Sequence, residues 1–298
     1  MDFHTSVLQK EVLEALQVVP GEYYLDATLG GGGHTKAILD FGGRVTALDV
    51  DTDAINYTSK KLGAKKLKSG VWVTPDTNLT IYQRNFKDLD EVARLAGIKA
   101  FAGVLFDLGV SSYMLDTPER GFSFSKNGPL DMRMDTGLGV TASDLINGLN
   151  EGELYELFTK LGEERNARRL ARDIVRSRLE KRIETTTDLA QIIKKSVGRR
   201  EKGIDPATRV FMALRIVVND ELNNLREALP RASQLLGTGG RLAVISFHSL
   251  EDRIVKDFFK SEPSLKMLNK KPLTASAQEL KENLRARSAK LRVAEKVT

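Results

Sequence analysis

Three short apolar segments that carry an aspartate at or near their ends constrain the fold most. Residues 23–28, 44–49 and 101–107 are rich in β-branched and aromatic residues, and they carry Asp26, Asp49 and Asp107. The chain between these segments has helical spacing, which predicts strands separated by helices and therefore a parallel, doubly wound α/β sheet. Such sheets bind ligands at the carboxyl ends of their strands, so we expect the three carboxylates at one ligand-binding edge.

A run of four glycines, Gly30–Gly33, joins the first predicted strand to a helix over residues 34–41. A glycine turn lets a ligand approach the backbone and the helix N-terminus, which favours a nucleotide-like ligand. The turn lacks the Gly-Lys-Ser/Thr ending of a phosphate-binding P-loop. The third small residue of the dinucleotide fingerprint would fall on Thr35 or Lys36, which disfavours NAD without excluding it.

The carboxylates beside this turn help to distinguish NAD from an adenosyl ligand. Asp49 lies 19 residues after Gly30, where an acid can accept hydrogen bonds from both hydroxyls of a ribose. Asp26 would repel a pyrophosphate but suits a ligand that carries an ammonium and a sulfonium, as S-adenosylmethionine does. The alternative for both aspartates is a structural role in a turn or a helix cap.

The pattern changes in the middle of the chain. Loops rich in Met, Gly and Ser are followed by helical segments, which predicts an inserted helical domain over residues 113–205 within a core of residues 1–112 and 206–298. We expect one long helix near residues 208–229 and a strand over 242–247. Residues 61–77 are interpreted as a loop with no assigned function.

Composition excludes several classes of protein. The chain has no cysteine, so disulfides, thiolate metal centres, radical iron–sulfur chemistry and cysteine nucleophiles are ruled out. Its three histidines lie far apart in sequence, and we expect no metal site. The first twenty residues are rich in charge and no apolar run is long enough to span a membrane, so we expect no membrane contact and a cytosolic location.

Positive charge is concentrated in two segments. Residues 266–298 hold 9 Lys/Arg against 3 Asp/Glu, and residues 165–202 hold 13 against 5. Two basic segments in a chain of pI 9.3 favour a polyanionic partner. The alternative is a solvated helix face together with a frayed tail.

Six motifs distributed along the chain resemble one family. They are Thr28-Leu-Gly-Gly-Gly-Gly-His34, Asp107-Leu-Gly-Val-Ser-Ser112, Glu119-Arg-Gly-Phe-Ser-Phe124, Asp131-Met-Arg-Met-Asp135, Ser246-Phe-His-Ser-Leu-Glu-Asp-Arg253 and Arg285-Ala-Arg-Ser-Ala-Lys-Leu-Arg292. The chain resembles the bacterial small-subunit ribosomal RNA methyltransferase H family, also called MraW, from His4 to Lys296.

The resemblance implies a class I S-adenosylmethionine-dependent methyltransferase with a Rossmann-like core and an inserted helical domain. Its implied reaction is methylation of the exocyclic N4 of a cytosine in the decoding region of 16S rRNA, with the small ribosomal subunit as partner. The cofactor-binding positions that it implies are Gly32, Gly33, His34, Asp49, Phe86, Asp107 and Met114, with Asp26 as a further candidate. Relatives usually carry Gln or His at the position of Met114, and Pro at that of Leu284.

The proposed reaction limits the catalytic candidates. Methylation of cytosine C5 needs a cysteine adduct, so the composition favours an amine or an oxygen as the target. Asp107 and the carbonyls that follow it are candidates to accept the hydrogens of an amine, and His248 is a candidate to contact the base or to take up a proton. Phe122, Phe124 and Phe247 are candidates to stack on the base, with core packing as the alternative for each.

The helix predicted around residues 165–179 should have one basic and one apolar face. We expect phosphate contacts from this face and from the C-terminal segment, through Arg165, Arg168, Arg172, Arg176, Arg285, Arg287 and Arg292. The alternative functions are a non-catalytic ribosome assembly factor that binds S-adenosylmethionine, a methyltransferase for another nucleic-acid or protein amine and, more distantly, a nicotinamide dehydrogenase. The sequence leaves the oligomeric state open.

Overall fold

The computed structural model describes residues 6–198 and 205–298. His4 and the basic residues at positions 199–202, which entered the sequence predictions, lie outside the described residues. The chain divides into two compact units, the first made of Met1–Ser111 with Leu222–Thr298 and the second of Ser112–Glu221. Each unit is described by itself.

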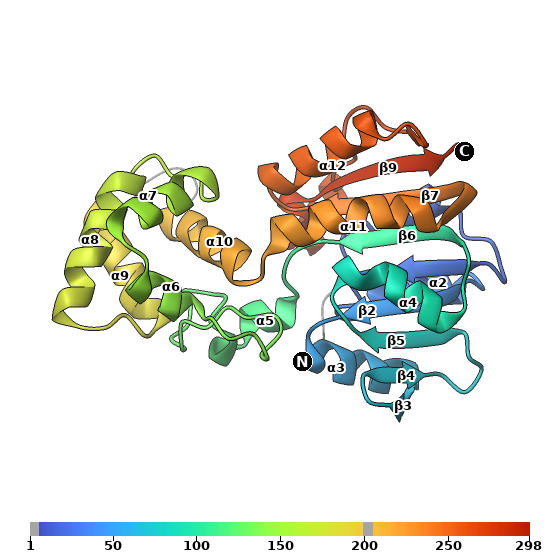
Figure 1. Cartoon of the computed structure of the whole chain (residues 1–298), viewed down its shortest axis with the longest axis horizontal. Helices are drawn as coiled ribbons and strands as arrows, with labels where there is room; N and C mark the ends of the chain where they lie inside the picture. Colours follow the sequence, from blue (N-terminus) through green and yellow to red (C-terminus); the bar gives the residue numbers. More distant parts are fainter. Residues whose placement is uncertain (1–5, 199–204) are drawn as a thin grey trace. The chain divides into compact units, whose positions relative to one another are not determined.

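The first unit contains a nine-stranded sheet with the order β3-β4-β5-β2-β1-β6-β7-β9-β8 (Figure 1). Its strands are β1 (Tyr23–Asp26), β2 (Arg44–Asp49), β3 (Lys65–Lys68), β4 (Val71–Val73), β5 (Leu79–Gln83), β6 (Phe101–Asp107), β7 (Leu236–Ser246), β8 (Leu265–Met267) and β9 (Lys290–Lys296). The five central strands, β5, β2, β1, β6 and β7, are parallel, whereas β9 runs antiparallel to both of its neighbours. The predicted parallel sheet is therefore confirmed.

Helices cover both faces of this sheet. They are α1 (Gln9–Leu16), α2 (Gly33–Asp40), α3 (Thr52–Leu62), α4 (Leu89–Ala96), α11 (Glu221–Leu235), α12 (Ser249–Ser261) and α13 (Ala277–Glu282). Residues of α4, α11 and α12 share one hydrophobic cluster with the sheet, and residues of α1, α2 and α3 share the other. Burial on two faces explains why the central strands read as nearly continuous apolar runs.

The second unit is helical. Its helices are α5 (Ser112–Asp116), α6 (Ala142–Gly148), α7 (Glu151–Lys160), α8 (Ala167–Glu180), α9 (Thr186–Val197) and α10 (Pro206–Val218). Within this unit α8 packs on α7 and α9, and α10 packs on α6, α7 and α9. Capping boxes at Thr141 and Asn150 set the starts of α6 and α7.

Two predictions about this region are corrected. The single helix expected near residues 208–229 is two helices, α10 and α11, because the chain turns between them at Asp220, whose φ of 51° is left-handed. The expected domain boundary at residues 205/206 lies instead after Glu221, because α10 packs with the helices of the second unit. Helical periodicity cannot reveal such a boundary, since a helix has the same pattern on either side of it.

Two segments interpreted as irregular are strands. Residues 61–77, predicted to be a loop, contain the antiparallel pair β3 and β4, and β4 pairs with β5 at one side of the sheet. The basic tail forms β9, which lies between β7 and β8. Among the helices that the structure describes, none has the length and apolar character needed to cross a membrane.

Candidate active site

The candidate site lies at the carboxyl ends of β2, β1 and β6, which are adjacent in the sheet. Asp49, Asp26 and Asp107 are the last residues of these three strands, in that order. The structure therefore brings to one edge the three carboxylates that the sequence predicted would meet there. Their environments differ, and so do the chemical roles open to them.

Asp26 is buried and holds the glycine turn in place. Its Oδ2 accepts the Thr35 hydroxyl at 2.6 Å and its Oδ1 accepts the backbone N–H of Thr28 at 3.1 Å. Burial raises the pKa of Asp26, although these hydrogen bonds and nearby His34 oppose that rise. With its side chain only 1% exposed, Asp26 has the geometry of the structural alternative, a turn residue.

Asp49 binds the same turn from the neighbouring strand. Its Oδ2 accepts the N–H of Gly30 at 2.8 Å and its Oδ1 accepts that of Asp51 at 2.9 Å. Burial raises the pKa of Asp49 to about 6, against the effect of these two bonds. The residue is partly exposed, and each carboxylate oxygen keeps a second lone pair that can accept a hydroxyl. This geometry suits the ribose contact expected of Asp49.

The glycine turn needs its glycines for two reasons. Gly30 and Gly32 have left-handed φ values of 47° and 70°, which disfavour residues with a Cβ. A Cβ on Gly32 would lie 2.4 Å from the Thr58 side chain, and one on Gly33 would lie 1.9 Å from the Ser6 hydroxyl oxygen. The space beside Gly32 and Gly33 is thus filled by the protein itself, so these glycines are required for packing.

His34 and Asp107 form the centre of the site. His34, in the first turn of α2, places Nε2 3.4 Å from Oδ2 of Asp107, although the two residues are far apart in sequence. Burial by itself lowers the pKa of His34, but the Asp107 and Asp26 carboxylates outweigh that effect and the pKa is raised. His34 Nδ1 and Asp107 Oδ1 are buried and have no hydrogen-bond partner among the residues described. Unpaired buried polar atoms are costly, and here they indicate a place for a polar ligand.

Thr28 also belongs to the site, although no role was predicted for it. Its hydroxyl accepts the backbone N–H of Asp107 at 2.7 Å and so fixes the end of β6 against the glycine turn. The signal in the sequence was its place at the start of the first motif, but the contact spans 79 residues and no local pattern reveals it.

The remaining cofactor candidates are placed as follows. Phe86 begins a short 3-10 helix after β5, and its ring packs edge-on against Phe106 with centroids 5.7 Å apart. This position, beyond the carboxyl end of a strand next to β2, is compatible with an adenine contact. Met114 lies in α5 of the second unit and is 4% exposed.

His248 occupies the N-cap of α12, immediately after Phe247 at the end of β7. Its Nδ1 accepts the N–H of Glu251 at 3.4 Å, and its Nε2 lies 3.2 Å from Oε1 of Glu251. Glu251 Oε2 in turn accepts the N–H of His248 at 3.3 Å, which completes a capping box, and it also accepts the N–H of Phe247 at 2.8 Å. This geometry favours the structural alternative for His248, in which the imidazole fixes the helix start.

The three aromatic candidates separate clearly. Phe122 is 6% exposed, and Phe124 packs edge-on against Phe211 with centroids 5.2 Å apart, so both have the core-packing role that was their alternative. Phe247 is partly exposed, and its ring lies next to Gly109, in the segment that follows Asp107. A Cβ added to Gly109 would be 3.5 Å from this ring. Phe247 is therefore the candidate best placed to contact a ligand at the end of β6.

The predicted RNA-binding arginines also divide into groups. Arg165, Arg168, Arg172 and Arg176 are exposed, and α8 buries its opposite face, so its predicted two-faced character is confirmed. Arg287 is exposed and Arg285 half-buried. The prediction for Arg292 is wrong, because its guanidinium is 5% exposed and donates to both Asp252 oxygens at 2.6 and 3.2 Å. This buried bidentate ion pair between β9 and α12 leaves Arg292 no access to RNA.

Three features of this sheet define a class of protein: its strand order with a reversed strand beside the parallel ones, its glycine turn, and its carboxylates at one edge. The class is a Rossmann-like methyltransferase of class I. The chain belongs to the MraW methylase family, whose model matches residues 1–297. The unpaired Asp107 oxygen fits an amine or ammonium donor, and the remaining lone pairs of Asp49 fit the ribose hydroxyls of S-adenosylmethionine, the methyl donor of this class.

Named relatives cover almost the whole chain. A "Ribosomal RNA small subunit methyltransferase H" from Nostoc punctiforme is 50% identical, over 99% of this chain and 94% of the relative. A protein of the same name from Deinococcus deserti is 47% identical, over 99% of this chain and 93% of its own length. Among solved structures, an rRNA methylase from Streptococcus thermophilus is 13% identical with a TM-score of 0.46, over the full length of both chains.

Proposed function

We propose that this protein transfers a methyl group from S-adenosylmethionine to the exocyclic N4 of a cytosine in the decoding region of small-subunit rRNA. The observation that carries the proposal is the partly buried Asp107 carboxylate at the end of β6, whose Oδ1 is buried without a hydrogen-bond partner among the described residues. It lies in a chain about half identical to a small-subunit rRNA methyltransferase. The partner is the small ribosomal subunit or its rRNA, and the place of action is the cytoplasm.

The bound cofactor supplies an electrophilic methyl on a sulfonium, and this chain's residues must hold it in line with the attacking nitrogen. Asp49 accepts the ribose hydroxyls, while the N-terminal turn of α2 presents backbone N–H groups that have no acceptor within the helix. Asp107 has one oxygen near His34 and one without a partner, so it can accept a hydrogen from an amine or an ammonium.

The cytosine amine is a weak nucleophile because its lone pair is delocalised into the ring. An acceptor for its hydrogens localises that lone pair toward the methyl, and we assign this task to Asp107 and to the carbonyls of Leu108 and Gly109. Transfer leaves a cationic nitrogen that loses a proton, and the nearby carboxylate favours that cation before the proton leaves. We assign the stacking contact with the base to Phe247, which His248 and Glu251 position through the cap of α12.

A direct test uses methyl-labelled S-adenosylmethionine and small ribosomal subunits from cells that lack the activity. After digestion of the RNA to nucleosides, we expect the label in N4-methylcytidine, identified by mass. Label in another nucleoside or in protein would overturn the assigned target. Tight cofactor binding without any transfer would support the alternative of a non-catalytic assembly factor.

The role of His248 is tested separately. His248→Asn keeps a side-chain acceptor that caps helices well but removes the titratable ring. If His248 only positions the helix, the variant keeps most of its activity and an unchanged pH profile, whereas His248→Ala loses stability and activity together. A loss of activity in His248→Asn with normal stability would instead support proton transfer by the imidazole.

A further inference from the structure

The hairpin made of β3 and β4 is the outermost part of the sheet, and nothing in the proposed function uses it. Between residues 54 and 75 the chain carries five lysines and no acidic residue. All five are exposed, and they are Lys60, Lys61, Lys65, Lys66 and Lys68. No carboxylate of the described residues forms an ion pair with any of them, so their charge is not neutralised locally.

The hairpin is held firmly in the sheet. β4 pairs antiparallel with β5 over three residues, and Trp72 is 6% exposed within the core. Lys66 lies 5.4 Å over the Trp72 ring, so the buried aromatic also orients one of the lysines. A rigid strand that displays Lys65, Lys66 and Lys68 has little entropy to lose when it meets a partner.

The tip of the hairpin lies at the same edge of the sheet as the candidate active site. Lys68 pairs with Val71 across the hairpin, and the carbonyl of Gly70 accepts the N–H of Gln83 at 2.8 Å. Gln83 is in turn the register partner of Asp49. At the start of the segment, Lys61 donates to the carbonyl of Gly31 in the glycine turn at 3.3 Å. Positive charge thus extends from the glycine turn to the hairpin tip.

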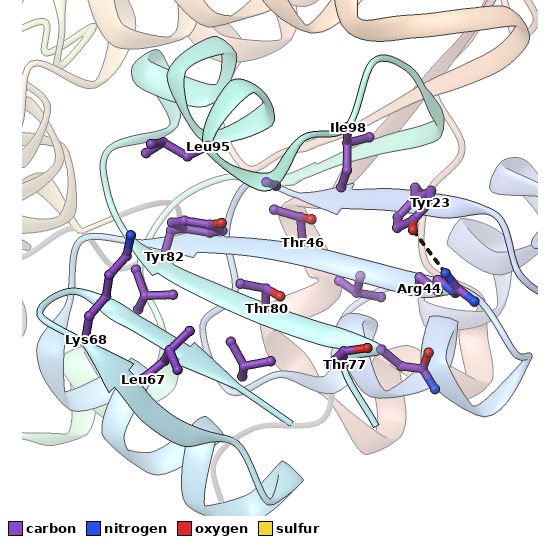
Figure 2. Close-up of a pocket in the computed structure, with 15 residues that line it drawn as sticks. Tyr23, Arg44, Thr46, Leu67, Lys68, Thr77, Thr80, Tyr82, Leu95 and Ile98 are labelled. Carbon is purple, nitrogen blue, oxygen red and sulfur yellow. Dashed lines mark hydrogen bonds between the residues drawn. The ribbon is translucent and has the colours of Figure 1, made fainter. Parts of the chain in front are cut away.

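A groove of about 330 Å³ runs along the sheet beside the hairpin (Figure 2). Thr46, Thr80 and Tyr82 line it from the sheet, and Lys68 extends along its rim. Arg44 lies at the far end, so a cation stands at each end of a hydroxyl-bearing surface. A positively charged groove with hydroxyls and an aromatic ring is typical of surfaces that bind single-stranded nucleic acid.

We propose that the edge strand carrying Lys65, Lys66 and Lys68, with the groove beside Lys68, binds the phosphate backbone of single-stranded rRNA next to the target cytosine. This inference rests on the proposed function, because it takes rRNA as the substrate that must reach the carboxyl edge of the sheet. The charge complementarity favours a polyanion, since residues 65–73 of the hairpin carry three lysines and no acid. Two strands, β4 and β5, separate the β3 lysines from β2, which ends at Asp49.

The test reverses the charge of the β3 lysines with the triple variant Lys65→Glu, Lys66→Glu, Lys68→Glu. The matched control reverses three exposed lysines elsewhere in the same unit, Lys99, Lys260 and Lys281, so both variants have the same net charge. Binding of small-subunit rRNA is measured by filter retention between 50 and 200 mM salt. S-adenosylmethionine affinity is measured by calorimetry, as a check of the active site.

We expect the hairpin variant to bind rRNA at least about tenfold more weakly than the control and to have a higher KM for rRNA, with unchanged cofactor affinity. The slope of log K against log salt should fall by about 2, since about 0.7 is lost for each contact with single-stranded phosphate. Equal rRNA binding by the two variants would overturn the proposal.

Lysines on an outer strand also prevent sheets from pairing edge to edge. If the lysines served only to prevent such pairing, the triple variant would self-associate, and its remaining monomer would bind rRNA with normal affinity. That result would also overturn the proposal. If the triple variant does not fold, the neutral variant Lys65→Gln, Lys66→Gln, Lys68→Gln replaces it with the same expected direction. Failure of the proposed function can be told apart from failure of this inference. In the first case the wild-type protein itself would produce no N4-methylcytidine in the rRNA.

Discussion

The carboxyl edge of the sheet and the arginine face of α8 both carry many charges, but they hold them in opposite ways. At the edge, hydrogen bonds hold Asp26 and Asp49 at fixed distances, both have raised pKa values, and Asp107 lies beside His34. On α8, Arg168, Arg172 and Arg176 extend into solvent. Arg172 has an ion pair of 3.7 Å with Asp173, and Arg168 lies over the Tyr155 ring.

This difference teaches which residues matter individually. A buried carboxylate has few partners and a low local dielectric, so the loss of one atom changes the site substantially. Exposed charges are screened by salt and act through their sum. The predictions below test that contrast, first at the edge of the sheet and then on α8.

The largest effect is expected for Asp107. Replacement by Ala removes the acceptor that we assign to the reacting nitrogen, and we expect methyl transfer to fall about 100- to 1,000-fold. Single-turnover transfer to rRNA measures this effect. Asp40→Ala, which removes an exposed carboxylate at the other end of α2, is the control and should keep full activity. A decrease below tenfold in Asp107→Ala would contradict the assigned role.

The second effect concerns pH. Because the pKa of Asp49 is about 6, this carboxylate is ionised above pH 6 and becomes protonated below it. Protonation removes a charged acceptor for the ribose, so S-adenosylmethionine affinity should fall about tenfold from pH 7 to pH 5. Calorimetry at several pH values tests this.

The pKa of His34 is raised by the Asp107 and Asp26 carboxylates, and burial raises that of Asp26. Asp49→Asn isolates the contribution of Asp49, because it removes that titrating carboxyl and leaves His34 and Asp26 in place. The assignment to Asp49 is wrong if Asp49→Asn and the wild-type protein show the same fall in affinity between pH 7 and pH 5.

A smaller effect is expected where the edge is structural. Thr35→Val keeps the shape of the side chain but removes the hydroxyl that donates to Asp26 at 2.6 Å. A buried carboxylate then lacks one partner, and the free energy of unfolding should decrease by about 1–3 kcal/mol. Urea denaturation measures it. The exposed Thr52→Val is the control, with an expected change within about 0.5 kcal/mol.

The smallest effect is expected on α8. Reversing Arg168 and Arg172 to Glu should weaken rRNA binding about three- to tenfold at low salt and leave S-adenosylmethionine affinity unchanged. Arg94→Glu with Arg226→Glu, two exposed arginines of the first unit, provides an equal change of net charge. If both double variants bind rRNA alike, the α8 face has no role beyond general charge.

The candidate site could be predicted from the sequence to the extent that its residues lie at strand ends. Asp26, Asp49 and Asp107 follow apolar runs, and parallel strands bring such ends together, so their meeting at one edge needed no three-dimensional information. The pairing of His34 with Asp107 was different. Both residues were identified as cofactor contacts, but nothing local indicates that Nε2 and Oδ2 lie 3.4 Å apart.

Two of the errors have one physical origin, which is contact between residues far apart in sequence. Arg292 was grouped with surface arginines because its neighbours are basic, yet Asp252 of α12, 40 residues away, forms a buried ion pair with it. Residues 61–77 were taken as a loop because β3 consists mainly of lysines, which are rare in strands. Pairing with β4, itself anchored on β5, makes that segment a strand.

The sequence by itself determined the class of fold, the glycine turn and the acids at the strand ends, because each depends on periodicity or on the conformation of a few adjacent residues. Only the tertiary structure decided which charges are buried and paired, such as Asp26 and Arg292, and which remain free to meet a partner, such as the lysines of β3. Burial depends on what packs against a residue, and those neighbours come from distant parts of the chain.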